Sequence, residues 1–131
     1  MPVRRPLLVL AALIATAAAA PALAAAKPRL TVTPSTVALG SPTVIAGRGW
    51  PVIEFCRRTV RLTLRSAQNA VPLAVMRIRD DGRFRYRWTP APRRVGPGRW
   101  RVVARQRCES GKDGSTIWNV RSAKVRLTAR P

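Results

Sequence analysis

The chain contains no histidine, the side chain that most often serves as a general base or a metal ligand. No serine therefore has a histidine partner for nucleophilic catalysis. The only two cysteines lack the spacing and the companions of a zinc site. The sequence also has neither a phosphate-binding loop nor a dinucleotide fingerprint. We therefore expect a protein that is not an enzyme and that uses no cofactor and no metal.

Acidic residues are scarce, with 5 Asp and Glu against 25 Lys and Arg, so the formal net charge is +20. The only carboxylate pair, Asp80-Asp81, precedes Gly82, and Asp-Gly is typical of hairpin turns rather than of catalytic sites. So large a positive charge resists aggregation and attracts polyanions. An arginine excess can also reflect a GC-rich genome, and charge alone therefore leaves the partner open.

The first residues are arranged like a secretory signal peptide. Two arginines, Arg4 and Arg5, precede an apolar run from Leu7 to Ala20. Small-residue cleavage sites follow at Ala22-Leu23-Ala24 or Ala24-Ala25-Ala26. The alternative is an uncleaved anchor, which is less favoured because a membrane span needs about 20 apolar residues.

Cleavage near Ala26 would divide the chain into a signal peptide, 1–26, and a single domain, 27–131. It would also remove Arg4 and Arg5, which lowers the net charge to +18. We expect the mature protein to be secreted, either to the extracellular space or to the cell envelope.

The segment 83–88 alternates basic and aromatic residues with period two. A β-strand would place Arg83, Arg85 and Arg87 on one face and the three rings on the other. Similar alternation over 59–66, 99–108 and 117–129 indicates about seven short strands and no helix after the signal peptide. This spacing favours a β-sandwich or a small barrel. Within it, Trp50, Trp88 and Trp100 are expected in the core, whereas Trp118 borders a loop.

Three stretches resemble bacterial secreted immunoglobulin-like domains. They are Leu30–Val37 followed by Gly40 and Val44–Trp50, then Asp81-Gly82-Arg83-Phe84, and then Pro97–Ala104. The resemblance covers nearly all of 27–131 and implies an all-β fold, an immunoglobulin-like antiparallel β-sandwich. Its motifs are structural and imply no chemistry.

An even number of cysteines in an exported chain favours one disulfide, between Cys56 and Cys108, over two free thiols. The resemblance supports this pairing. In an immunoglobulin-like sandwich the third and sixth strands pair antiparallel. Cys56 would precede the third strand and Cys108 would end the sixth.

In that topology the outward residues of the third, sixth and seventh strands share one sheet face. Adjacent basic columns there would suit phosphates, sulfates or anionic lipid headgroups, because a guanidinium pairs with two oxygens at once. Nucleic acid is a less natural partner for an exported protein. The candidate anion-binding residues are Arg61, Arg65, Arg99, Arg101, Arg105, Arg107, Lys124 and Arg126. By contrast, Arg83, Arg85 and Arg87 would lie on the opposite sheet, exposed to solvent.

Three functional hypotheses follow. The first is an exported, non-catalytic binding or adhesion module that uses the basic face on an anionic partner, either a cell-envelope polymer or lipid headgroups. The second is a structural envelope protein with no dedicated ligand, whose charge serves solubility. The third is a cationic antimicrobial protein. The loop 109–116 is a further candidate for recognition, although its composition equally fits a flexible connection.

Overall fold

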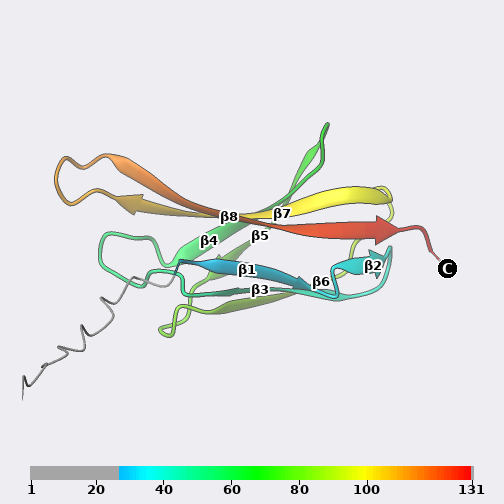
Figure 1. The fold of residues 1–131 in the computed structure, drawn as a ribbon, viewed down its shortest axis with the longest axis horizontal. Helices are drawn as coiled ribbons and strands as arrows, with labels where there is room; N and C mark the ends of the chain where they lie inside the picture. The colour runs from blue at the N-terminus through cyan, green and yellow to red at the C-terminus, as the bar shows by residue number, and fades with distance from the viewer. Residues whose placement is uncertain (1–26, 131) are drawn as a thin grey trace, which may run out of the picture.

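The structure, a computed structural model, describes residues 27–130; the signal peptide expected over 1–26 lies outside the described residues. No helix that could cross a membrane is found in this described part. Figure 1 shows two layers of strands. Eight strands form them: β1 (Arg29–Thr33), β2 (Thr36–Ala38), β3 (Thr43–Arg48), β4 (Thr59–Arg65), β5 (Ala70–Arg77), β6 (Phe84–Trp88), β7 (Gly98–Glu109) and β8 (Thr116–Thr128).

The strands form a three-stranded sheet, β1-β3-β6, and a five-stranded sheet, β2-β8-β7-β4-β5. β4 pairs antiparallel with β7, and β6 lies in the opposite sheet, as the sequence predicts. This strand order is that of an immunoglobulin-like sandwich, so the predicted fold class is confirmed. There are eight strands rather than about seven because Pro34-Ser35 interrupts the first one. β1 pairs with β3, whereas β2 runs parallel to β8 in the other sheet.

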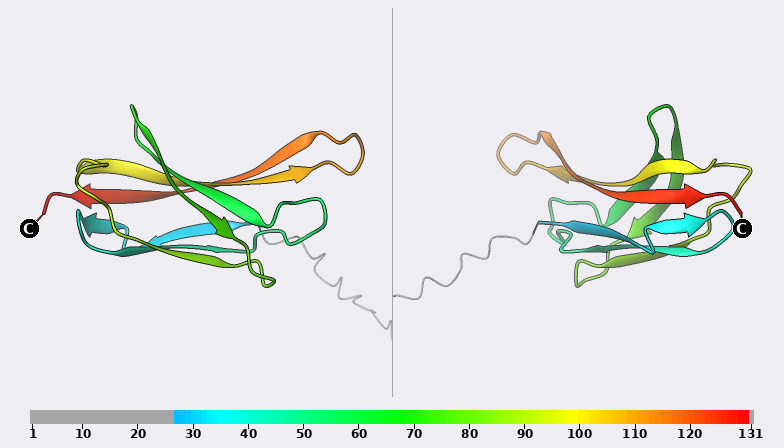
Figure 2. Two further views of the ribbon diagram at one scale, coloured as in Figure 1. Left: turned by 180° about the vertical axis from the view of Figure 1, so that it is seen from behind. Right: turned by 45° about the vertical axis from the view of Figure 1, so that its right-hand side comes forward.

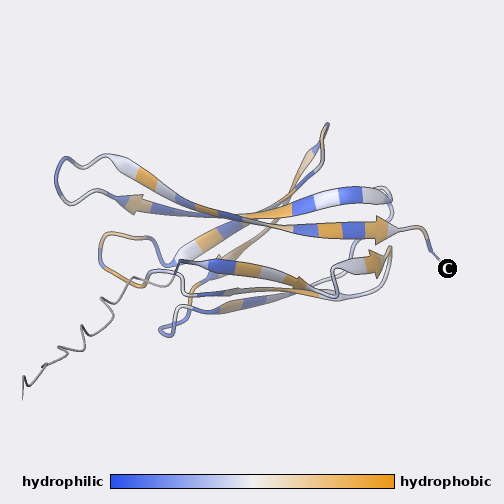
Figure 3. Cartoon of the chain, in the orientation of Figure 1, coloured by the Kyte–Doolittle hydropathy of each residue, from blue (hydrophilic) through white to orange (hydrophobic). Residues whose placement is uncertain are grey.

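The core lies between the two sheets and follows the period of two. Figure 3 shows hydrophilic and hydrophobic residues alternating along the strands. Val60, Leu62 and Leu64 on β4 are completely buried, while Arg61 and Arg65, which alternate with them, are exposed. On β6, Phe84 and Trp88 are buried, and Arg85 and Arg87 face solvent. The predicted core residues Trp50, Trp88 and Trp100 are all buried.

One end of the sandwich is tied by the disulfide that the sequence predicts. Cys56 and Cys108 are bonded and also form an isolated antiparallel bridge. This bond attaches the loop between β3 and β4 to the end of β7. Disulfides of this kind are typical of proteins from oxidising compartments such as the extracellular space.

A buried glutamine holds the same loop from within. Gln106 has no exposed surface, and its side-chain amide donates to the backbone carbonyls of Pro51 and Arg57, both at 2.8 Å. Its side-chain oxygen accepts a hydrogen bond from Asn119 Nδ2 at 3.1 Å. The backbone of Arg57 is therefore fixed against β7 from two sides, since its N–H also donates to the Arg107 carbonyl at 2.9 Å.

Replacing Gln106 by leucine is expected to lower the free energy of unfolding by about 3 kcal/mol, because two carbonyls and the Asn119 amide lose their partner in a buried site. Urea unfolding would measure the loss. Gln68→Leu is the control, because Gln68 is exposed in the β4–β5 turn and should change stability by less than about 0.5 kcal/mol. Equal stability of the two variants would contradict the proposed role of Gln106.

Candidate anion-binding face

All eight candidate residues project from the outer face of the five-stranded sheet. On β4, β7 and β8 they alternate with buried core residues such as Leu62, Val102 and Val125. The register brings several cations directly opposite one another on neighbouring strands, where Cβ atoms lie about 5 Å apart. Their location is therefore as predicted, and their role in binding stays a prediction.

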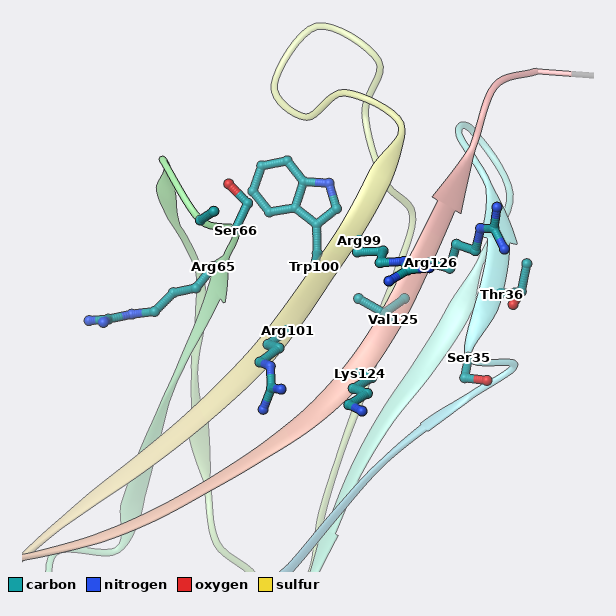
Figure 4. A pocket seen from close by; sticks show the side chains of 11 residues that line it. Ser35, Thr36, Arg65, Ser66, Arg99, Trp100, Arg101, Lys124, Val125 and Arg126 are labelled. Carbon is teal, nitrogen blue, oxygen red and sulfur yellow. The ribbon is translucent and has the colours of Figure 1, made fainter.

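Five of the cations gather at the end of the sheet opposite the disulfide. Arg101 on β7 lies between Arg65 on β4 and Lys124 on β8, and Arg99 lies opposite Arg126. Together with Trp100 they line an open hollow of about 690 Å³. Figure 4 shows Arg99 and Arg126 close together, whereas Arg65 extends away from the other four. We call these five residues the groove cluster.

The remaining three cations, Arg61, Arg105 and Arg107, lie toward the disulfide end. Arg61 pairs with Arg105 across β4 and β7, and Arg107 lies opposite Trp118 on β8. A neutral row, Thr63, Val103 and Ser122, separates them from the groove cluster. The predicted single patch is thus two groups of cations. The two groups lie about 13 Å apart along the strands, because four residues of β4 lead from Arg61 to Arg65.

Sequence reasoning missed two residues of this second group. Arg57 lies in the irregular segment before β4 and lines the same hollow as Arg61 and Arg107. Trp118 is 49% exposed on the outer face, and the Arg105 guanidinium carbon lies 4.8 Å from its ring centroid. The position of Trp118 in the alternation of β8 could have indicated an outward ring, because it shares the parity of Lys124 and Arg126.

The acidic residues leave the groove cluster uncompensated. All five lie at the disulfide end: Glu54, Asp80, Asp81, Glu109 and Asp113. Among residues 27–130 the one salt bridge joins Arg58 to Asp80 at 2.8 Å and is largely exposed. At the tip of the β7–β8 hairpin, the Ser115 backbone N–H donates to Asp113 and lowers the pKa of that carboxyl. The end of the sheet opposite the disulfide therefore carries positive charge that no nearby carboxylate of the described residues compensates.

The other candidates of the sequence lie elsewhere. Arg85 and Arg87 project from the outside of the three-stranded sheet, and Arg83 is exposed beside the β5–β6 turn, as predicted. The 109–116 loop forms the exposed tip of the β7–β8 hairpin, which projects away from the β4–β5 hairpin in both views of Figure 2. Over residues 27–130, no cluster of three His, Cys, Asp or Glu side chains is present that could hold a metal ion.

The fold and this face define an immunoglobulin-like β-sandwich with a strongly basic outer sheet surface. No model of a known protein family matches the chain, and no curated protein matches it. Among solved structures, one of murine CRIg is similar, with a TM-score of 0.43 and 12% sequence identity over 79% of this chain and 98% of that chain. The fold assignment rests on the strand order and register.

Proposed function

We propose that the protein is an exported, non-catalytic binding module that holds an anionic cell-envelope polymer on the outer face of its five-stranded sheet. The observation that carries this proposal is the register of β4, β7 and β8. It places cations directly opposite one another, at Arg65–Arg101–Lys124 and at Arg99–Arg126. Like charges in such positions repel one another, so a bound anion would relieve a cost that the free protein bears.

The spacing of the cations favours a polymer over a small anion. Two groups of cations lie about 13 Å apart along the strands, with uncharged side chains between them. A flexible chain with repeated phosphate or sulfate groups can contact both groups at once, and the second contact then needs no further encounter in solution. Arginine suits such groups because its planar fork donates two parallel hydrogen bonds.

Neutralising four of the five cations of the groove cluster, all except Arg65, is expected to weaken binding of long-chain polyphosphate or heparin about 100-fold at low ionic strength. The variant is R99Q/R101Q/K124Q/R126Q. The slope of log affinity against log salt should also become shallower by about three, because fewer counterions are released. Isothermal titration at several salt concentrations measures both quantities.

The matched control is R29Q/R48Q/R85Q/R87Q, which removes four exposed charges from the outside of the three-stranded sheet. Both variants have the same net charge, so this control should retain most of the affinity. Equal losses would mean that net charge, rather than this face, attracts the polymer. If the wild type binds no polyanion at low ionic strength, the function is instead that of a structural envelope protein with no dedicated ligand.

A membrane-active cationic protein is the second candidate, favoured by exposed apolar side chains beside the arginines. Val75, Trp118 and Val120 are 62%, 49% and 39% exposed on the same sheet face. Under this alternative, the protein would release dye from vesicles that contain phosphatidylglycerol. Under the proposed polymer-binding function, such vesicles remain sealed.

A further inference from the structure

A second hollow, of about 190 Å³, lies on the same face near the disulfide end. No carboxylate lines this hollow. Four arginines do: Arg57, Arg61, Arg105 and Arg107. Trp118 and Val75 form its apolar wall. Arg57 and Arg107 also line a neighbouring hollow with Glu54 and Glu109, but no salt bridge joins these residues in the described part of the chain. The positive charge beside Trp118 therefore favours a compensating anion. We call this group of residues the Trp118 site.

Two hydrogen-bond donors at this site lack acceptors. The Nε atoms of Arg105 and Arg107 are buried, and neither has a hydrogen-bond partner in the structure. Buried polar groups in folded proteins are nearly always paired. An anion in the hollow would supply oxygen acceptors to these two guanidinium groups, and the Nε atoms would reach it if the groups turned from their present buried orientation.

The surrounding structure holds two of these arginine side chains, Arg105 and Arg107, and the backbone of a third, Arg57. The Arg105 guanidinium stacks on the Trp118 ring, and Arg107 Nη2 donates to Thr116 Oγ1 at 3.4 Å. The Arg57 backbone is fixed by Gln106 and by the Arg107 carbonyl. Side chains that are already ordered lose less entropy when a ligand binds, so the site is organised in advance for an anion.

We propose that the Trp118 site binds a phosphate group. This proposal rests on the proposed function, because it names the anion that one part of the basic face would hold. A carboxylate offers two oxygens and one charge, which a single guanidinium fork satisfies. A terminal phosphate offers three strong acceptor oxygens, and neighbouring phosphates along a chain offer two each, so phosphate can engage several arginines together. The phosphate can belong to a polymer or to the headgroups of a lipid surface, since in both the free phosphate oxygens can accept hydrogen bonds from the arginines.

Titration with inorganic pyrophosphate at low ionic strength tests the site, with the Trp118 indole N–H signal in NMR spectra as a local readout. The wild-type signal should shift saturably. In R105Q/R107Q the apparent affinity at this signal should fall about tenfold or more. The matched control R99Q/R126Q removes two positive charges that face each other at the other end of the same sheet. It should change the apparent affinity at the Trp118 signal about threefold or less. Thermal unfolding of each variant verifies the fold.

Three results would overturn the proposal: no shift of the Trp118 signal up to millimolar pyrophosphate, an equal shift with acetate, or equal weakening in both variants. A failure of the phosphate proposal for the Trp118 site can be distinguished from a failure of the proposed polymer-binding function. If the Trp118 site fails while the groove-cluster variant still loses polyphosphate, the polymer-binding function stands. If polyphosphate binds nowhere while pyrophosphate still shifts Trp118, the polymer-binding function alone is wrong.

The source of the phosphate group is distinguished by repeating the measurement with long-chain polyphosphate and with phosphatidylglycerol vesicles. A response of the Trp118 signal to polyphosphate alone supports a polymer as the source. A blue shift of the tryptophan fluorescence with vesicles, abolished in R105Q/R107Q, supports a lipid headgroup. A response to neither would overturn the assignment of a larger phosphate-bearing partner to this site.

Discussion

Removal of the disulfide between Cys56 and Cys108 is expected to lower the free energy of unfolding by about 4 kcal/mol, because the bond closes a loop with a sequence separation of 52. Single domains are stable by only about 5–15 kcal/mol, so this is a large share. The midpoint of thermal unfolding should fall by about 20 °C. The loss restores chain entropy to the unfolded state rather than removing many contacts from the folded one.

The measurement compares the wild type, the reduced wild type and C56A/C108A by thermal unfolding at one pH and salt concentration. Intact mass before and after reduction, with alkylation of the thiols, shows whether the bond is present at the start. The reduced wild type separates the effect of the bond from the loss of the two sulfur atoms. If reduction leaves the unfolding midpoint unchanged, the stabilising role of the bond is wrong.

Gly47→Ala is expected to destabilise the protein by about 3 kcal/mol, because the core has no space for an added methyl group. A Cβ at position 47 would overlap Cε1 of the Phe84 ring. Phe84 cannot swing into solvent, since it is only 2% exposed and packs against Trp50 with ring centroids 5.8 Å apart. Gly47 on β3 and Phe84 on β6 also lie directly opposite each other in the sheet. The ring of Phe84 therefore occupies the space that a side chain at position 47 would need.

Urea unfolding of four variants, G47A, G96A, F84L and G47A/F84L, tests this packing. Gly96→Ala is the control, because a Cβ there would meet no atom within 4 Å, and its stability should change by less than about 0.5 kcal/mol. In a second comparison, G47A/F84L should be more stable than the sum of the two single losses predicts, since the smaller side chain makes room. Strict additivity would contradict a direct clash between Gly47 and Phe84.

The fold was largely predictable from the sequence because each strand has one solvent-exposed face and one buried face. The alternation of 83–88 correctly assigned Phe84 and Trp88 to the core and Arg85 and Arg87 to solvent. The sequence also predicted the disulfide, because an exported chain with two cysteines has only one intramolecular pairing. The strand count was less predictable. Whether Thr36–Ala38 continues the first strand or joins the other sheet depends on pairing with β8, a strand about 90 residues away.

The candidate site was predictable only in part. Alternation placed Arg61, Arg101 and Arg126 on an outer face, but it could not state which cations lie opposite one another. It also missed the neutral row that divides the face, because that row is formed by one residue from each of three separate strands. Arg57 could not be identified at all, since it lies outside any regular strand and reaches the site through the loop that the disulfide and Gln106 hold.

By itself, the sequence determined the all-β class, the core faces of the strands, the disulfide and a strong positive charge with few acidic residues. These properties are local or compositional, because side-chain parity and charge do not depend on which strands are neighbours. The tertiary structure decided the rest: the two groups of cations, the acids gathered at one end, and the stacking of Arg105 on Trp118. The physical reason is register, since only the pairing of distant strands determines which side chains come close enough to share an anion.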